Sequence, residues 1–168
     1  MRIYIPATLS MLQQLVADGS LQPVSGTAFA VTPKLREAYA EGDDDELGEV
    51  ALREAALASL RLLAGAAEDS GDDLPPRRAV LVADVGDVTL RPDLDDAVVR
   101  IGAPVTSDDV VAAFVDNAAA EAQVKAAVAV VDAADLGDED AELTVGDAQD
   151  HDLAWYAVQE LPFLLELL

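Results

Sequence analysis

The fold class is indicated most clearly by one apolar segment, Ala79-Val80-Leu81-Val82-Ala83. No polar residue interrupts this run, and it is too short for an ordinary helix, so it predicts a strand that is buried on both faces. A strand buried in this way implies that other elements cover its sheet. We therefore expect one α/β or α+β domain over residues 1–168, with a mixed sheet of about six strands covered by helices.

The segments on either side alternate between strand and helix patterns. Arg2-Ile3-Tyr4-Ile5 has the period of a strand, and Thr8 and the pair Thr32-Pro33 are typical helix starts. Residues 110–115 are ambiguous, but their β-branched run favours a strand. Other expected strands are 27–31, 97–101 and 153–157, and other expected helices are 43–64, 118–131 and 159–168.

Two stretches are expected to be loops. Residues 65–78 contain Gly, Ser, Asp and a double proline, which is the composition of a loop. Residues 135–152 contain eight acids and no Lys or Arg. We interpret this second stretch as a solvated acidic loop.

Composition excludes several classes of function. The chain has 33 Asp and Glu against 10 Lys and Arg, a net charge of −23, which argues against binding to nucleic-acid phosphates or to anionic lipid. Hydrophobic residues make up 52%, so the chain is not disordered as a whole. No run of apolar residues is long enough to cross a membrane, the apolar end at 161–168 included, and nothing resembles a signal peptide. The expected location is the cytoplasm.

Common catalytic and cofactor signatures are missing. Without cysteine the chain has no disulfide, thiol nucleophile, zinc–thiolate site or iron–sulfur site, and it has no glycine-rich phosphate loop. Its only histidine, His151, lies between Asp150 and Asp152, and these carboxylates favour the protonated form, which is a poor general base. We expect no cofactor, and a non-enzyme is favoured.

One spacing resembles a calcium-binding loop. Acids and a glycine fall at EF-hand positions, but the fifth position is Leu47, which has no ligating side chain. The same residues fit an amphipathic helix with acids at its positive end. We therefore predict a helix and no bound metal for the residues that match the loop, which are Asp43, Asp45, Gly48, Val50 and Glu54.

Four charged residues at strand positions are weak candidates for chemistry. Asp84 and Asp116 each follow an apolar run, and a pair of carboxylates at strand ends could serve hydrolysis. Arg2 and Arg100 lie on strands opposite the expected core faces. They could clamp an anionic ligand, although internal salt bridges are favoured in so acidic a chain.

The C-terminal segment carries the candidate partner-binding residues. Trp155 and Tyr156 are adjacent on a strand and so face opposite sides. Phe163, Leu164 and Leu167 belong to an apolar helix that has more apolar faces than one core contact hides, so a homodimer is expected, with burial inside one subunit as the alternative. The 43 residues after Lys125 hold 11 acids and no Lys or Arg. The alternative partner is therefore a basic protein.

Four segments of the sequence resemble those of a known protein family. The chain resembles short, acidic, uncharacterised actinobacterial proteins that share a domain of unknown function. A coding bias toward alanine, and toward arginine over lysine, fits that source. The resemblance implies a single bacterial cytosolic domain and transfers no catalytic residue. It rests on Met1-Arg2-Ile3-Tyr4-Ile5-Pro6-Ala7-Thr8-Leu9, on residues 28–37, on Ser59-Leu60-Arg61-Leu62-Leu63 and on residues 155–162.

Two main classes of function remain. The expected function is a non-catalytic protein-interaction or regulatory module. The alternative is a small hydrolase or ligand-binding protein with a carboxylate or arginine site at the strand ends. A narrower third hypothesis is a nucleic-acid mimic that occupies a basic protein surface.

Overall fold

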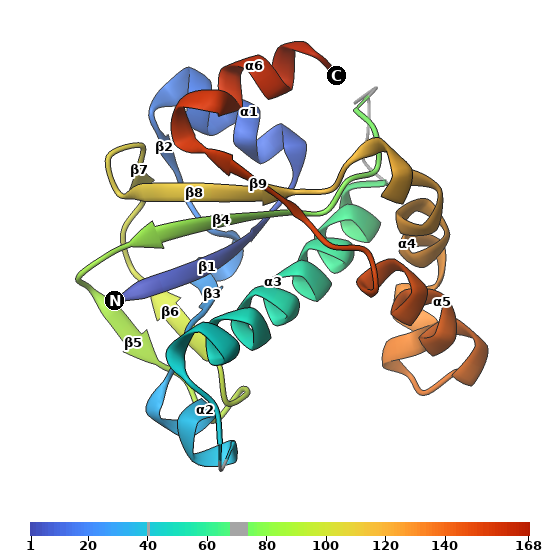
Figure 1. Cartoon of the computed structure of the whole chain (residues 1–168), viewed down its shortest axis with the longest axis horizontal. Coiled ribbons are helices and arrows are strands. Elements are labelled where there is room, and N and C mark those ends of the chain that lie inside the picture. The colour runs from blue at the N-terminus through green and yellow to red at the C-terminus, as the bar shows by residue number, and fades with distance from the viewer. Residues whose placement is uncertain (40, 68–73) are drawn as a thin grey trace.

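A computed structural model describes residues 1–39, 41–67 and 74–168 of the chain (Figure 1). Within these residues, neighbouring strands of the main sheet pair antiparallel, and β2 (Ser20–Leu21) and β7 (Val105–Thr106) form a separate antiparallel ribbon. The expected α+β class is confirmed; the sheet is antiparallel, and β5 (Val88–Leu90) adds a strand to those expected. The strand order is β5 (Val88–Leu90), β6 (Val98–Ile101), β3 (Thr27–Phe29), β1 (Arg2–Ala7), β4 (Ala79–Asp84), β8 (Val110–Val115) and β9 (Ala154–Ala157).

The run at residues 79–83 forms β4, close to the middle of the sheet. Its five residues are buried, with Leu81 on one face and Val80 on the other, as predicted. β1 pairs with β4 along its whole length, from Arg2 opposite Asp84 to Ala7 opposite Ala79. Side chains of the two strands therefore line two separate cores, one on each face.

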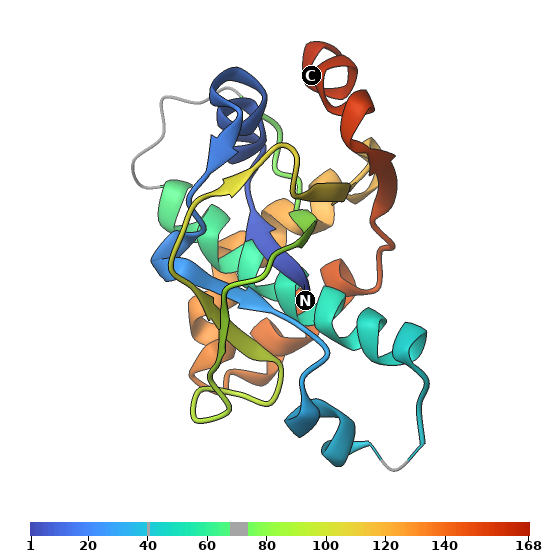
Figure 2. The same cartoon turned by 90° about the vertical axis from the view of Figure 1, so that its left-hand side faces the viewer.

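Helices cover both faces of the sheet (Figures 1 and 2). α1 and α6 pack on one face, and α3 packs on the other, with α4 and α5 against the C-terminal half of α3. No helix in the described part of the chain is long and apolar enough to cross a membrane. The helices are α1 (Leu9–Asp18), α2 (Pro33–Ala38), α3 (Asp44–Ala67), α4 (Glu121–Asp135), α5 (Glu139–Gln149) and α6 (Leu161–Glu166), and the short 3₁₀ turns are η1 (Val24–Gly26), η2 (Ala118–Ala120) and η3 (Val158–Glu160).

The predicted helix starts are confirmed by their capping bonds. The hydroxyl of Thr8 accepts a hydrogen bond from the Met11 amide at 3.3 Å, and the hydroxyl of Thr32 accepts one from the Leu35 amide at 3.1 Å. Asp43 caps α3 in the same way, because its carboxylate accepts from the Glu46 amide at 2.9 Å. Each bond satisfies an amide that the first turn of a helix leaves unpaired.

The prediction of a solvated acidic loop at residues 135–152 is wrong, because residues 139–149 form the helix α5. The carboxylate of Asp138 accepts from the Ala141 amide at 2.9 Å, and three further acids in the first turn face the positive end of the helix dipole. Ala141, Val145 and Ala148 are buried at helical spacing. This narrow face of small side chains packs α5 closely against its neighbours, while the acids point to solvent.

The expected loop at 65–78 begins later than predicted. α3 continues to Ala67, because the alanine-rich end of the segment favours a helix despite Gly65. Residues 68–73 of this expected loop lie outside the described residues. Residues 74–78 are irregular and lead directly into β4.

Candidate functional site

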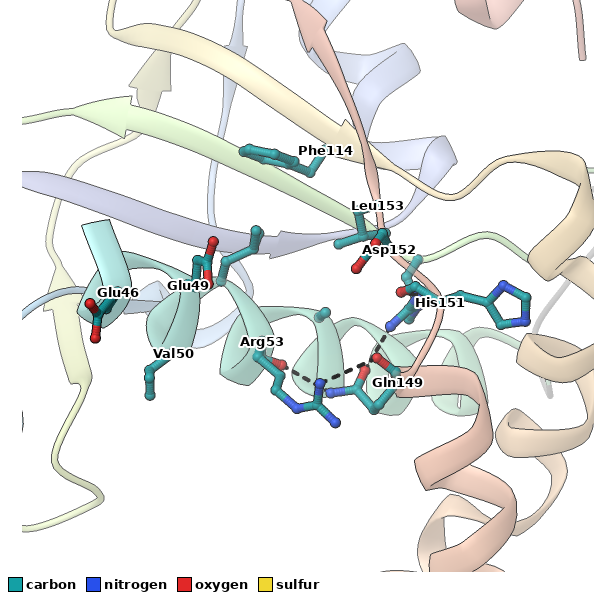
Figure 3. Close-up of a pocket in the computed structure, with 12 residues that line it drawn as sticks. Glu46, Glu49, Val50, Arg53, Phe114, Gln149, His151, Asp152 and Leu153 are labelled. Carbon is teal, nitrogen blue, oxygen red and sulfur yellow. Dashed lines mark hydrogen bonds between the residues drawn. The ribbon is translucent and has the colours of Figure 1, made fainter. Parts of the chain in front are cut away.

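A cleft of about 560 Å³ lies between α3 and the sheet, at the end where β9 begins (Figure 3). One wall is the N-terminal half of α3, and the other is the connection from α5 to β9. Phe114 of β8 lies over the space between them. The lining residues are Glu46, Glu49, Val50, Leu52, Arg53, Ala56, Arg78, Phe114, Gln149, His151, Asp152 and Leu153.

A buried ion pair supports the second wall. Arg78 and Asp116 are almost completely inaccessible to solvent, and the Nη2 and Nε atoms of Arg78 donate to the Asp116 carboxylate at 2.8 and 2.9 Å. The Arg78 amide also donates to this carboxylate, at 2.8 Å. Two charges so deeply buried are stable only with such a complete set of partners.

The remaining donors of Arg78 hold the wall of the cleft. Its Nη1 atom donates to the side-chain oxygen of Gln149, and its Nη2 atom donates to the backbone oxygen of His151, both at 2.8 Å. Gln149 is the last residue of α5, and its side-chain amide donates to the backbone oxygen of Arg53 at 3.1 Å. Arg78 therefore fixes the α5–β9 connection against α3.

Carboxylates from both walls face the cleft. Glu49 on α3 and Asp152 on the other wall point toward the space beneath Phe114 (Figure 3), and Glu46 lies farther along α3. Among the described residues none of these three carboxylates forms an ion pair. The charge of Arg78 is compensated by Asp116, and Arg53 has Asp150 4.0 Å away. The cleft is therefore negative.

Apolar side chains form the rest of the cleft. Phe114 and Leu153 are half-buried from the sheet side, and Val50 and Ala56 contribute from α3. Carboxylates beside an aromatic face suit a cation on an apolar stem, such as an arginine or lysine side chain. The residues that line the cleft include no Ser or Thr, so the described lining offers no hydroxyl nucleophile.

The ring of His151 does not face this cleft. Its Nε2 atom contacts the side-chain oxygen of Gln123 on α4, and the ring points away from Glu49 and Asp152 (Figure 3). His151 contributes its backbone oxygen to the Arg78 network. It serves here as a packing and positioning residue.

The comparisons with known proteins identify a family. The model of a family of unknown function, DUF6912, matches residues 1–165. The chain belongs to the DUF6912 family. No curated protein matches it, and no solved structure matches it either. The resemblance to a domain of unknown function is thus confirmed, and DUF6912 membership brings no activity with it.

The structure separates the two candidate carboxylates. Asp84 ends β4 and Asp116 follows β8, and because these neighbouring strands are antiparallel, the two residues lie at opposite ends of the strand pair. Asp84 instead meets Arg2, whose Nε and Nη2 atoms donate to it at 3.0 and 3.1 Å, and this contact lowers the pKa of Asp84. In this DUF6912 chain, Asp84 and Asp116 therefore do not form the paired site that hydrolysis requires.

Arg100 lies away from the other candidates, on β6. Its Nη1 atom donates to the backbone oxygen of Ser25 at 3.0 Å, and its Nε atom is buried without a partner among the described residues. Arg2 and Arg100 thus lie apart, on strands separated by β3. They do not converge on one ligand.

The candidate partner-binding residues divide into two groups. Trp155, Phe163 and Leu167 are exposed, with 58%, 68% and 86% of their surface accessible. Tyr156 is partly buried against the core on the α1 side, and Leu164 is buried within that core. Only the first group is available to a partner.

The segment with calcium-loop spacing is the start of α3, as predicted. Eleven residues of helix separate Asp43 from Glu54 by about 16 Å, so the two carboxylates cannot share one ion. Within the described residues no group of three or more His, Asp or Glu side chains could hold a metal. That calcium does not bind tightly stays a prediction, which calorimetry of the wild type and Glu54→Ala tests.

The carboxyl group of Glu54 should make the stability of the protein depend on pH. Burial raises the pKa of this carboxyl, and Asp95 nearby raises it further, so folding disfavours the ionised form. Glu54→Gln should therefore increase the free energy of unfolding at neutral pH. The gain should disappear in acid, where the wild-type carboxyl is protonated in both the folded and the unfolded state. Urea unfolding at both pH values measures this, and an equal gain at each would contradict it.

Sequence reasoning missed Arg78, Glu49 and Phe114. The signal for Arg78 was its position as the second residue of a double arginine directly before a buried strand. A charge at such a position must be compensated by a partner. Glu49 and Phe114 gave no signal of their own. Both line the cleft because α3 packs across β1, β3 and β4, and β4 is the neighbour of β8.

Proposed function

We propose that this protein is a non-catalytic interaction module that binds a basic segment of a partner protein in the cleft between α3 and the α5–β9 connection. The observation that carries the proposal is that Glu49 and Asp152 both face the space beneath Phe114 (Figure 3) and form no ion pair with any described residue. The net charge of −23 adds long-range attraction for such a partner.

The cleft favours a basic side chain over a bare metal ion. Its apolar part would contact the methylene stem of an arginine or lysine, and its carboxylates would accept hydrogen bonds from the charged end. The ion pair of Arg78 and Asp116 supports a preformed wall, which reduces the entropy that binding costs. A nucleic-acid mimic would instead need carboxylates spaced along one surface rather than gathered in a cleft.

A short oligoarginine peptide is the probe for this proposal. The double variant Glu49→Gln/Asp152→Asn should weaken its binding by about tenfold or more, because each lost carboxylate removes a charge-assisted hydrogen bond. Asp18→Asn/Asp108→Asn is the matched control, since it removes two exposed acids elsewhere and changes the net charge equally. Isothermal titration calorimetry of the three proteins at low salt measures the difference.

The control variant distinguishes binding at the cleft from attraction to the overall negative charge of the protein. If the cleft is the binding site, the control variant should bind oligoarginine nearly as well as the wild type does. The wild-type affinity should fall as salt rises from about 50 to 500 mM, because this change shortens the Debye length several-fold. Equal weakening in the two double variants would reject the cleft as the binding site.

The proposed location is the cytoplasm, and the proposed source is an actinobacterium. The alanine-rich composition, with more arginine than lysine, supports the source. The regulatory role, in this proposal, is exerted through the bound partner.

A further inference from the structure

The sheet has an open edge at β9. β9 pairs with β8 on one side, and in the described part of the chain no strand pairs with its other side. Figure 2 shows β9 at the outer margin of the molecule, leading up to α6. The backbone amides and carbonyls along this edge are a template for a further strand.

This edge has neither a charged residue nor a proline, two of the features that usually prevent such pairing. β9 reads Ala154-Trp155-Tyr156-Ala157, with no charge and no proline. The opposite edge, β5, is only three residues long and is followed by Arg91 and Pro92. Charged residues, prolines and short length protect sheet edges, so β5 is the better protected edge of the main sheet, although β9 has only four residues itself.

Exposed apolar side chains flank the open edge. Trp155 lies on β9 itself, on the face toward α3. On α6, Leu161 and Leu164 pack into the core, while Phe163 and Leu167, four residues apart, share a face that points outward. The chain therefore leaves apolar surface uncovered on this side.

The charge of this segment indicates what covers it. Residues 153–168 contain two acids, Glu160 and Glu166, out of the 33 in the chain. A basic partner is attracted to the acidic surfaces elsewhere. A second copy, itself carrying −23, can approach closely only where the charge is sparse.

We propose that the protein forms a homodimer in which β9 pairs antiparallel with β9 of a second copy, with Trp155, Phe163 and Leu167 covering the contact. A two-fold axis lets one contact satisfy the open edges of both copies and closes the assembly at two. This inference does not depend on the cleft. Salt should strengthen the dimer, because it screens the repulsion between two acidic chains, whereas it should weaken the binding of a basic segment.

Trp155 is the only tryptophan, so its fluorescence reports directly on β9. As protein concentration rises through the micromolar range in high salt, sedimentation should show the mass change from 17.6 kDa to twice that value. In parallel, Trp155 emission should shift to the blue and become less accessible to acrylamide. A mass that stays at 17.6 kDa, or dimerisation without protection of Trp155, would overturn the proposal.

A matched pair of variants locates the contact. Phe163→Glu should weaken dimerisation by about tenfold or more, because it adds a charge to each side of the apolar interface. Leu143→Glu on α5 changes an equally exposed residue, at 69% against 68%, by the same charge and should have little effect. Equal weakening by the two variants would place the contact elsewhere and overturn the β9 interface. Neither Phe163 nor Leu143 lines the cleft, so oligoarginine binding measured on monomeric protein tests the cleft separately.

Discussion

Replacing Arg78 with methionine should lower the free energy of unfolding by about 3–5 kcal/mol, the usual cost of breaking a buried ion pair. The substitution leaves the Asp116 carboxylate buried without its partner. It also removes the donors to Gln149 and to the backbone of His151. The loss of stability should therefore be accompanied by weaker oligoarginine binding under conditions where the variant is still folded.

Two comparisons make the Arg78 prediction specific. Arg91→Met removes an arginine whose pair with Asp93 is exposed, and it should change the stability little. The double variant Arg78→Met/Asp116→Leu should regain most of the lost stability, because no unpaired charge remains inside. Urea unfolding monitored by circular dichroism measures all three. A small loss for Arg78→Met, similar to that of Arg91→Met, would show that the ion pair does not hold the fold.

Ser59→Ala should destabilise the protein by about 2–4 kcal/mol, because it leaves two buried backbone groups without partners. The Ser59 hydroxyl is fully buried on α3 and donates to the backbone oxygen of Ala7 at 2.7 Å. It also accepts from the amide of Ala79 at 3.1 Å. This hydroxyl thus bonds α3 to the ends of β1 and β4, which pair at these two residues.

Ser10→Ala on α1 is the control for Ser59, since Ser10 is exposed. It should leave the midpoint of urea unfolding nearly unchanged, because alanine is a good helix former and no buried group loses a partner. If both serine variants unfold at the same urea concentration, the hydroxyl of Ser59 is not what joins α3 to the sheet.

Elements whose signals are local could be predicted from the sequence. β4 follows from an uninterrupted apolar run, and the starts of α1 and α2 follow from Thr8 and Thr32, whose side chains cap the first turn. The sequence predicts a loop in place of α5, because residues 135–152 contain eight acids and this composition is typical of a solvated loop. The spacing of Ala141, Val145 and Ala148 behind Asp138 was the signal for a helix, but alanines give a weak apolar pattern.

The candidate site could not be predicted in the same way, because it depends on contacts between distant segments. Asp116 was recognised as a carboxylate after an apolar run, but nothing near it in the sequence indicates that Arg78 neutralises it. Glu49 and Asp152 line one cleft only because α3 packs across β1, β3 and β4 and the end of α5 returns to α3 before β9 begins. Such placement is set by strand order and helix packing, which short-range patterns do not determine.

The most direct test of the cleft is a titration of ¹⁵N-labelled protein with the oligoarginine peptide, followed by amide chemical shifts. Our account predicts that the largest changes are confined to residues 46–53 of α3, to Phe114 and to residues 149–153. Changes spread equally over other acidic segments, such as the first turn of α5 and residues 106–109, would contradict it and would mean that the peptide responds to the overall charge and not to a site.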